Sequence, residues 1–252
     1  MPVARNIFDV YKNEPALQEA VRTLRTNIQF SSVDKPIKTI VLTSVAPGEG
    51  KTSIAIALGI SMAEAGKKTL LIEMDCRRPM LGNRLKIRPK FNWINVLYND
   101  MPISEAAVPT IVKNLFFMDV EMQMTHLAEV ISSNKFNFML SKLSNEYDTI
   151  LFDTPPLGMF IEAAVLANRT DGTLLVIKPG MNDTQEELDV IAQLEKANAR
   201  ILGVILNGVQ YSSNKNGYYH YYKGEKKHSV QKRKKFNREG KRSVQKKKKF
   251  NR

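Results

Sequence analysis

The feature that most constrains this chain is a glycine-containing loop at residues 46–53. It lies between an apolar run at 39–42 and an apolar, helically periodic segment at 54–65. A strand that leads into such a loop and then into a helix directs backbone N–H groups, the positive end of the helix dipole and a lysine into one small volume. A glycine-rich turn with a surface lysine is the alternative, but the flanking strand and helix favour a site for a di- or triphosphate.

The residue types of this loop fit that chemistry. Gly48 and Gly50 let the backbone approach phosphate oxygens, Lys51 can reach the terminal phosphates, and the Thr52 hydroxyl can bind Mg²⁺. A strict Walker A motif would have glycine at position 45, where this chain has valine. Asn207 follows the last predicted strand and could pair with an adenine edge, although Asn before Gly is also a plain turn signal. The predicted nucleotide-binding residues are Pro47, Gly48, Glu49, Gly50, Lys51, Thr52, Ser53 and Asn207.

Carboxylates follow two further apolar runs. The run at 69–72 ends in Glu73 and Asp75, and the run at 149–152 ends in Asp153. Each could be an ordinary strand end before a polar turn. Because the carboxyl ends of parallel strands meet at one edge of a sheet, we expect these carboxylates to lie beside the phosphate loop, where Mg²⁺ would need oxygen ligands.

Alternation of strand-like and helix-like segments predicts an α/β fold. β-branched, apolar strands separated by helices are typical of a doubly wound parallel sheet with helices on both faces. We predict one domain over residues 1–210, with an irregular start at 1–13 and one short helix near residues 93–97. The predicted strands are 39–44, 69–73, 115–120, 149–153, 172–177 and 201–206, and the predicted helices are 14–30, 53–65, 127–144, 162–167 and 184–197.

Length and composition exclude several classes of protein. The chain has 252 residues, enough for a full core, and no apolar stretch of about 18 residues that could span a membrane. The first residues lack the apolar region of a signal peptide, so we expect a cytoplasmic protein. A single cysteine, Cys76, fits a reducing compartment and excludes an internal disulfide, and three scattered histidines form no zinc motif.

The net charge of +13 belongs to the last thirty residues. Residues 223–252 carry a net charge of +13 themselves, so residues 1–222 are balanced and give no argument for DNA binding. The segment 227–238 recurs as 241–252 with two changes. We predict that this tail is disordered on its own. It could contact anionic lipid, nucleic acid or an acidic polymer, or it could be solvated without a dedicated partner.

Two other segments carry candidate functional residues. In the predicted helix at 14–30, three charged residues spaced three positions apart lie along one side of the helix. They could form a solvated face or an interaction motif. They are Glu19, Arg22 and Arg25. After the last predicted strand, five of the eight tyrosines lie in one polar segment. The segment could be a poorly ordered tail, its tyrosines could stack on nucleic acid bases, or they could accept phosphate. These tyrosines are Tyr211, Tyr218, Tyr219, Tyr221 and Tyr222.

Taken together, these motifs resemble those of the bacterial tyrosine kinases of the capsule and exopolysaccharide type, P-loop proteins unrelated to eukaryotic protein kinases. The resemblance covers about residues 14–222. Residues 48–52 are similar to the family's Walker A loop, 70–77 to its Walker A′ motif and 150–156 to its Walker B motif. The Glu-x₂-Arg-x₂-Arg motif at 19–25 is similar to the family's oligomerisation motif, and the tyrosine-rich stretch at 218–222 is similar to its autophosphorylated cluster. Glu73 stands where the family usually has aspartate, and the basic tail is not part of the family pattern.

The resemblance implies a kinase that uses ATP and Mg²⁺ and phosphorylates its own tyrosines between the subunits of a ring. It also implies protein-tyrosine substrates and activation by the cytoplasmic segment of a separate membrane protein, at the inner face of the cell membrane. We expect Lys51, Glu73, Asp75 and Asp153 to be catalytic and Thr52, Asp75 and Asp153 to hold Mg²⁺. Either Glu73 or Asp75 would accept the tyrosine proton.

Two other functions remain open. One is an ATPase switch of the kind found in partitioning and positioning proteins, with the basic tail as its anchor on a membrane or on DNA. The other is a catalytically weak regulatory scaffold, suggested by valine at position 45 and by Glu73. Neither accounts for five tyrosines beside the end of the fold.

Overall fold

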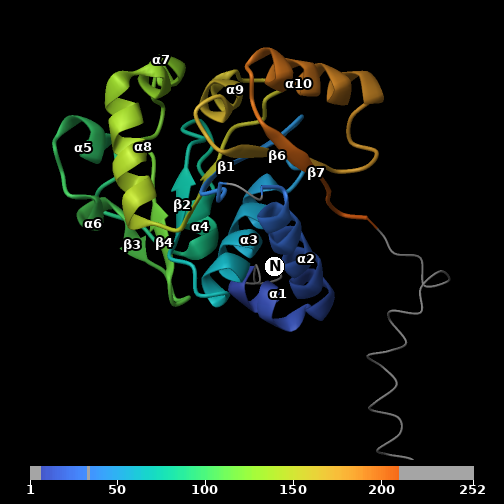
Figure 1. Ribbon diagram of the computed structural model, residues 1–252, viewed down its shortest axis with the longest axis horizontal. Helices are drawn as coiled ribbons and strands as arrows, with labels where there is room; N and C mark the ends of the chain where they lie inside the picture. The colour runs from blue at the N-terminus through green and yellow to red at the C-terminus, as the bar shows by residue number, and fades with distance from the viewer. Residues whose placement is uncertain (1–6, 33–34, 210–252) are drawn as a thin grey trace, which may run out of the picture. The chain divides into compact units, whose positions relative to one another are not determined.

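The computed structural model describes residues 7–32 and 35–209. The tyrosine cluster at 211–222 and the basic tail at 223–252 lie outside the described residues. The core is a seven-stranded sheet in the order β3-β4-β2-β5-β1-β6-β7, in which only the β3 and β4 pair is antiparallel (Figure 1). The predicted doubly wound α/β fold is confirmed. The strands are β1 (Thr39–Ser44), β2 (Thr69–Glu73), β3 (Val108–Pro109), β4 (Leu115–Met118), β5 (Thr149–Asp153), β6 (Gly172–Ile177) and β7 (Ile201–Leu206).

The central strands are buried along their whole length, as expected for a parallel sheet covered on both faces. Strand β5 lies between β2 and β1, with Asp153 paired to Glu73 on one side and to Leu42 on the other. This register brings the ends of three strands to one edge of the sheet. The phosphate loop and both predicted carboxylate segments therefore begin side by side.

Four helices cover one face of the sheet (Figure 1). Helix α3 is apolar on nearly every side, because it packs between the sheet and α2. Helix α2 is amphipathic: Val21 and Ile28 are buried, and Leu17 and Leu24 pack at the edge of the same core. These helices are α1 (Ile7–Asn13), α2 (Pro15–Phe30), α3 (Lys51–Glu64) and α4 (Leu81–Leu85).

The remaining helices cover the opposite face. Trp93 and Phe136 meet edge to face at the centre of this second layer, with ring centroids 5.8 Å apart. Helices α9 and α10 extend the layer over β6. These helices are α5 (Trp93–Tyr98), α6 (Ile103–Ala106), α7 (Leu127–Ser132), α8 (Asn134–Glu146), α9 (Glu162–Ala167) and α10 (Thr184–Lys196).

The structure differs from three local predictions. The expected irregular start is wrong over residues 7–13, which form α1, where Tyr11 donates a hydrogen bond to Glu64 on α3 at 3.2 Å. The single helix expected at 127–144 is two helices, because extended Ser133 ends α7 and its hydroxyl caps the N–H of Phe136 in α8. The expected strand at 115–120 ends at Met118 and gains the two-residue partner β3.

Candidate active site

The phosphate loop connects β1 to α3. Gly48 and Gly50 have φ angles of 89° and 94°, in the left-handed region that glycine adopts without strain. Gly50 is the N-cap of α3, so Lys51 and Thr52 occupy its first turn, where unpaired N–H groups and the helix dipole favour an anion. The loop therefore has the backbone that the sequence predicts for a phosphate site.

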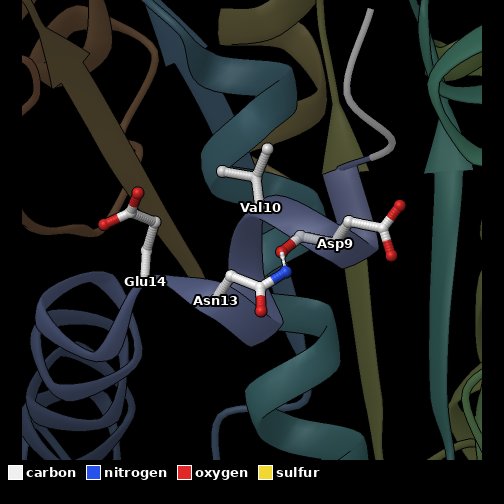
Figure 2. Close-up of a pocket in the computed structure, with 4 residues that line it drawn as sticks. All are labelled: Asp9, Val10, Asn13 and Glu14. Carbon is white, nitrogen blue, oxygen red and sulfur yellow. Dashed lines mark hydrogen bonds between the residues drawn. The ribbon is translucent and has the colours of Figure 1, made fainter.

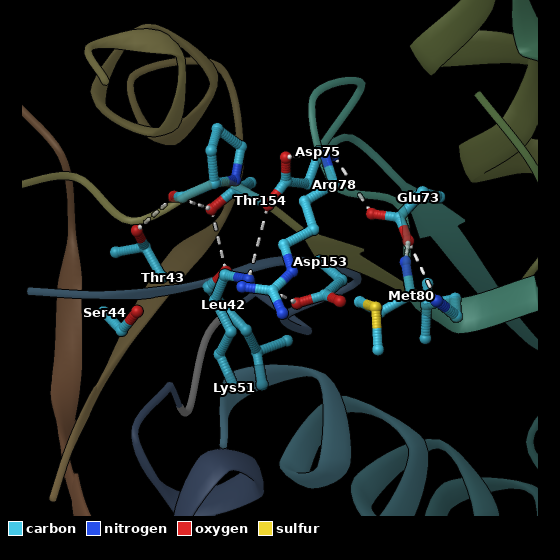
Figure 3. Close-up of polar contacts among 12 residues, drawn as sticks. Leu42, Thr43, Ser44, Lys51, Glu73, Asp75, Arg78, Met80, Asp153 and Thr154 are labelled. Atoms are coloured by element: carbon cyan, nitrogen blue, oxygen red, sulfur yellow. Dashed lines mark hydrogen bonds and ion pairs between the residues drawn. The ribbon is translucent and has the colours of Figure 1, made fainter. Parts of the chain in front are cut away.

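Lys51 extends from this helix toward two carboxylates (Figure 3). Its Nζ lies 3.7 Å from Oδ2 of Asp75 and 3.9 Å from Oδ1 of Asp153. All three side chains are largely buried, with Asp153 almost wholly enclosed. Three predicted catalytic residues, from three different elements, thus converge at the end of the sheet.

Asp153 has a carboxylate oxygen that is suited to a cation. Its Oδ1 is buried and accepts no hydrogen bond from the part of the chain that the structure describes. Burial raises the pKa of Asp153, and the positive charge of Lys51 and the hydroxyl of Thr52 act in the opposite direction. A buried acceptor without a donor is costly unless a ligand satisfies it.

Mg²⁺ fits this oxygen set, because it prefers one or two carboxylates together with phosphate oxygens and water. Within residues 7–32 and 35–209, no group of three or more His, Cys, Asp or Glu side chains is placed to hold a metal ion alone. The oxygen donors at this end of the sheet that could hold Mg²⁺ together with a nucleotide are those of Thr52, Asp75 and Asp153. The metal would neutralise charge on the terminal phosphates.

The carboxylate of Glu73 holds the loop that follows β2 (Figure 3). Its Oε2 accepts from the N–H groups of Met80 and Leu81 at 2.8 and 2.9 Å, and its Oε1 accepts from the N–H of Asp75 at 3.0 Å. Burial, together with the charge of Asp153, raises the pKa of Glu73 to about 8. Both oxygens are engaged with the backbone of its own loop.

Asp75 is the more available of the two candidate bases. Its Oδ1 accepts from the N–H of Arg78 at 2.9 Å, which fixes the side chain, and its Oδ2 faces Lys51. The carboxylate stands at the start of the loop rather than inside the strand. It can therefore face a substrate hydroxyl beside the terminal phosphate.

Asn207 lies against the phosphate loop. Its Nδ2 donates to the main-chain oxygen of Glu49 at 2.7 Å, and its N–H donates to Ile177 at the end of β6. A Cβ at position 50 would collide with this amide, which gives a second reason for glycine there. The amide thus supports the loop directly, and its predicted role toward adenine stays a prediction.

The charged residues of α2 fall into two groups. Arg22 pairs with Glu19 at 3.0 Å on the exposed side of the helix. Arg25 instead donates to the main-chain oxygen of Ser61 at 2.6 Å and to its hydroxyl at 3.1 Å, both on α3. Arg25 is therefore an intramolecular contact in this chain, whereas Glu19 and Arg22 remain accessible.

An ion pair that the sequence did not reveal joins the segments after β2 and β5. Nη2 of Arg77 lies 2.7 Å from Oε1 of Glu162, and the guanidinium stacks 4.1 Å from the centroid of the Phe160 ring. Glu162 is buried, and among the described residues its other oxygen has no hydrogen-bond donor. Nothing in the local sequence distinguishes Glu162 from an ordinary first-turn glutamate.

A surface pocket of about 390 Å³ lies where α1 meets α2 (Figure 2). It is lined by Asp9, Val10, Asn13 and Glu14, and the Asn13 side chain bonds the main-chain oxygen of Asp9 at 2.8 Å. None of these residues belongs to the phosphate loop or to a strand end. This pocket is separate from the candidate active site.

The sheet order, the loop and the converging carboxylates define a P-loop nucleotide-binding protein of the doubly wound class. The family model described as "AAA domain" matches residues 37–206. Tyrosine-protein kinase YwqD of Bacillus subtilis strain 168 is 32% identical over 228 residues, covering 90% of this chain and 95% of the relative. Tyrosine-protein kinase CpsD of Streptococcus pneumoniae serotype 4 is 35% identical over 201 residues, covering 79% and 88%.

Solved structures agree with this assignment. The chimeric protein CapA2B2 superposes with a TM-score of 0.72 at 28% identity, covering 77% of this chain and 85% of that one. The septum site-determining protein MinD of Pyrococcus horikoshii, complexed with Mg-ADP, gives 0.57 at 26% identity, covering 70% and 72%. The chain belongs to the bacterial tyrosine-protein kinase family.

Proposed function

We propose that this protein transfers the γ-phosphoryl group of ATP to tyrosine, and that its own tyrosine cluster is an acceptor. The observation that carries the proposal is the convergence of Lys51 with Asp75 and Asp153 at the phosphate loop. Family membership supports tyrosine as the acceptor, since the relatives are named tyrosine-protein kinases.

The residues of the site have separate roles in this reaction. The N–H groups of the loop and Lys51 bind the ATP phosphates, and Thr52 and Asp153, with Asp75 nearby, hold Mg²⁺. The phenol oxygen forms a bond to the γ-phosphorus while the bridging bond to the β-phosphate breaks and ADP leaves. Positioning and charge stabilisation supply most of the rate enhancement.

The phenol proton passes to Asp75. A free phenol has a pKa of about 10, so a carboxylate close to the attacking oxygen must accept or steer its proton. Glu73 is less suited, because both of its oxygens accept hydrogen bonds from its own loop. We therefore assign Glu73 a positioning role, in which it fixes the loop that carries Asp75.

The acceptors are the tyrosines of the cluster, presented by one subunit of a ring to the active site of the next. Exposed Glu19 and Arg22 on α2 are suited to contacts between subunits. Each phosphorylated tyrosine would add a charge of about −1.5 to −2, so repulsion would loosen the ring. Assembly and release would then alternate with the phosphorylation state.

The kinase would act at the inner face of the cell membrane. Among the residues that the structure describes, no helix is long and apolar enough to cross a bilayer. In this proposal a separate membrane protein recruits and activates the kinase through its cytoplasmic segment. By analogy with the family, the cycle would regulate capsular or exopolysaccharide synthesis and export, and the basic tail would add an electrostatic contact to an anionic surface.

Purified protein incubated with labelled ATP and Mg²⁺, alone and with the cytoplasmic segment of a candidate activator, tests the proposal. Wild type is compared with Lys51→Met and with a variant whose five clustered tyrosines are changed to phenylalanine. We expect label on tyrosine in wild type only. Phosphate release without labelled protein under every condition would instead favour an ATPase switch, the alternative that the likeness to MinD supports.

A further inference from the structure

The side chain of Glu49 lies inside the protein, although its backbone belongs to the phosphate loop. It is 1% exposed. Its Oε2 accepts from the N–H of Ala46 at 2.8 Å, across the loop itself. Its Oε1 accepts from the N–H of Lys178 at 3.0 Å and from Nδ2 of Asn182 at 2.7 Å. Both oxygens of the carboxylate are thus engaged by donors of the protein itself.

These contacts join three segments that are distant in the sequence. Lys178 and Asn182 belong to the turn between β6 and α10, and Met181 in that turn faces Gly48. The main-chain oxygen of Glu49 accepts from Asn207 at the end of β7. One residue therefore connects the loop to the β6–α10 turn through its side chain and to β7 through its backbone.

We propose that Glu49 is a positioning residue that holds the phosphate loop in its anion-binding shape and anchors it to the β6–α10 turn through Asn182. The carboxylate binds the N–H of Ala46 and keeps the loop closed upon itself. The loop N–H groups that remain then face the nucleotide without first rearranging. Preorganisation of this kind raises the affinity for nucleotide, because the loop then loses little conformational entropy when the nucleotide binds.

The substitution Glu49→Gln tests the hydrogen bonds that this carboxylate accepts. Donors approach both oxygens of Glu49, whereas glutamine has one acceptor and one NH₂ group. In either orientation of the amide its NH₂ faces an N–H donor, from Ala46 on one side or from Lys178 and Asn182 on the other. The substitution keeps the size of the side chain and reverses the polarity of one contact.

The experiment measures the Kd of Mg-ADP by displacement of a fluorescent ADP analogue, together with the apo-protein Tm and the KM and kcat of autophosphorylation. For Glu49→Gln we expect the Kd of Mg-ADP and the KM for ATP each to rise about tenfold or more. The kcat at saturating ATP should stay within about threefold of wild type. Asn182→Ala removes one of the three donors and should raise Kd by about two- to fivefold. It also keeps the test decisive if Glu49→Gln does not fold.

Asp171→Ala is the matched control. Asp171 is a half-buried carboxylate that also accepts hydrogen bonds from backbone N–H groups, those of Lys38 and Thr39 at the opposite end of β1. The substitution should lower the Tm of the apo-protein and leave the Kd of Mg-ADP unchanged. If Glu49→Gln and Asn182→Ala also lower Tm without changing Kd, Glu49 has a purely structural role and the inference is overturned.

The inference rests on the proposed function only for the meaning of KM and kcat. If wild type binds Mg-ADP but labels no tyrosine, the kinase proposal fails, and a raised Kd in Glu49→Gln still supports the role of Glu49. If wild type transfers phosphate and Glu49→Gln binds nucleotide as tightly as wild type does, the kinase stands and the inference fails.

Discussion

Nη1 of Arg25 lies 2.6 Å from the main-chain oxygen of Ser61, so this arginine of α2 is bound to α3 of its own chain. Arg22, one turn earlier, pairs along the helix surface with Glu19 at 3.0 Å. The two arginines of the Glu-x₂-Arg-x₂-Arg motif thus differ in their contacts: Arg25 fixes α2 on the domain, and the side chain of Arg22 is exposed.

Substitution should separate the effects of these two arginines. We expect Arg25→Ala to lower the free energy of unfolding by about 1 to 3 kcal/mol, because a charge-assisted bond to Ser61 is lost. Arg22→Ala should change the free energy of unfolding by at most about 0.5 kcal/mol and should shift the assembly toward monomer. Urea denaturation and light scattering measure the two effects. An unchanged assembly state in Arg22→Ala would contradict the proposed role of α2 in a ring.

Glu73 offers a second prediction, which tests the assignment of the base. Glu73→Asp retracts the carboxylate by one methylene, so it should lose the N–H groups of Met80 and Leu81 and destabilise the protein by about 1 to 3 kcal/mol. Phosphoryl transfer by the folded variant should fall by less than about tenfold. Asp75→Asn should lower transfer by about 100-fold or more, because it removes the base.

The comparison of these variants uses transfer rates at saturating ATP, with Kd for nucleotide as the control for binding. Equal losses of transfer in Glu73→Asp and Asp75→Asn, with binding intact in both, would reassign the base to Glu73.

The ion pair between Arg77 and Glu162 gives a third prediction. Arg77→Ala leaves a buried carboxylate without its partner and should destabilise the protein by about 1 to 3 kcal/mol, a range reduced by the partial exposure of Arg77. The double variant Arg77→Ala with Glu162→Gln should be more stable than Arg77→Ala alone, because the unpaired charge is gone. Thermal unfolding of the two single variants and the double variant measures the coupling. Additive changes would show that the pair does not link the segments after β2 and β5.

The sequence predicts the architecture of this site because strand ends are local signals. An apolar run that stops at a carboxylate already places Glu73 and Asp153, and the parallel order of the sheet then brings them together. The hydrogen-bond partners of the charged side chains depend on the conformations of loops, which no local sequence pattern encodes. Glu49 meets Asn182, and Arg25 meets Ser61, through contacts between segments far apart in the sequence. The sequence therefore does not distinguish Glu73 from Asp75 as the base, whereas the N–H groups around Glu73 do.

A fourth prediction concerns pH and the far end of β1. Burial alone would raise the pKa of Asp171, but hydrogen bonds from Thr39 and the N–H of Lys38, together with the charge of Lys35, lower it below its usual value. A carboxylate with a lowered pKa stabilises the fold above the unfolded-state pKa of about 4, and this contribution is lost as the pH falls through the folded-state pKa.

Asp171→Asn keeps an acceptor for these donors but removes the charge. We expect it to be less stable than wild type by about 1 kcal/mol at pH 7, because charged acceptors form stronger hydrogen bonds than neutral ones. The difference should shrink as the pH falls below about 4, where wild-type Asp171 begins to take up its proton. Urea denaturation between pH 7 and pH 3 measures it, with exposed Glu121→Gln as a control that should change little at any pH. A difference that stays constant down to pH 3 would show that the Asp171 charge contributes nothing to folding, since only a titrating charge gives the difference its pH dependence.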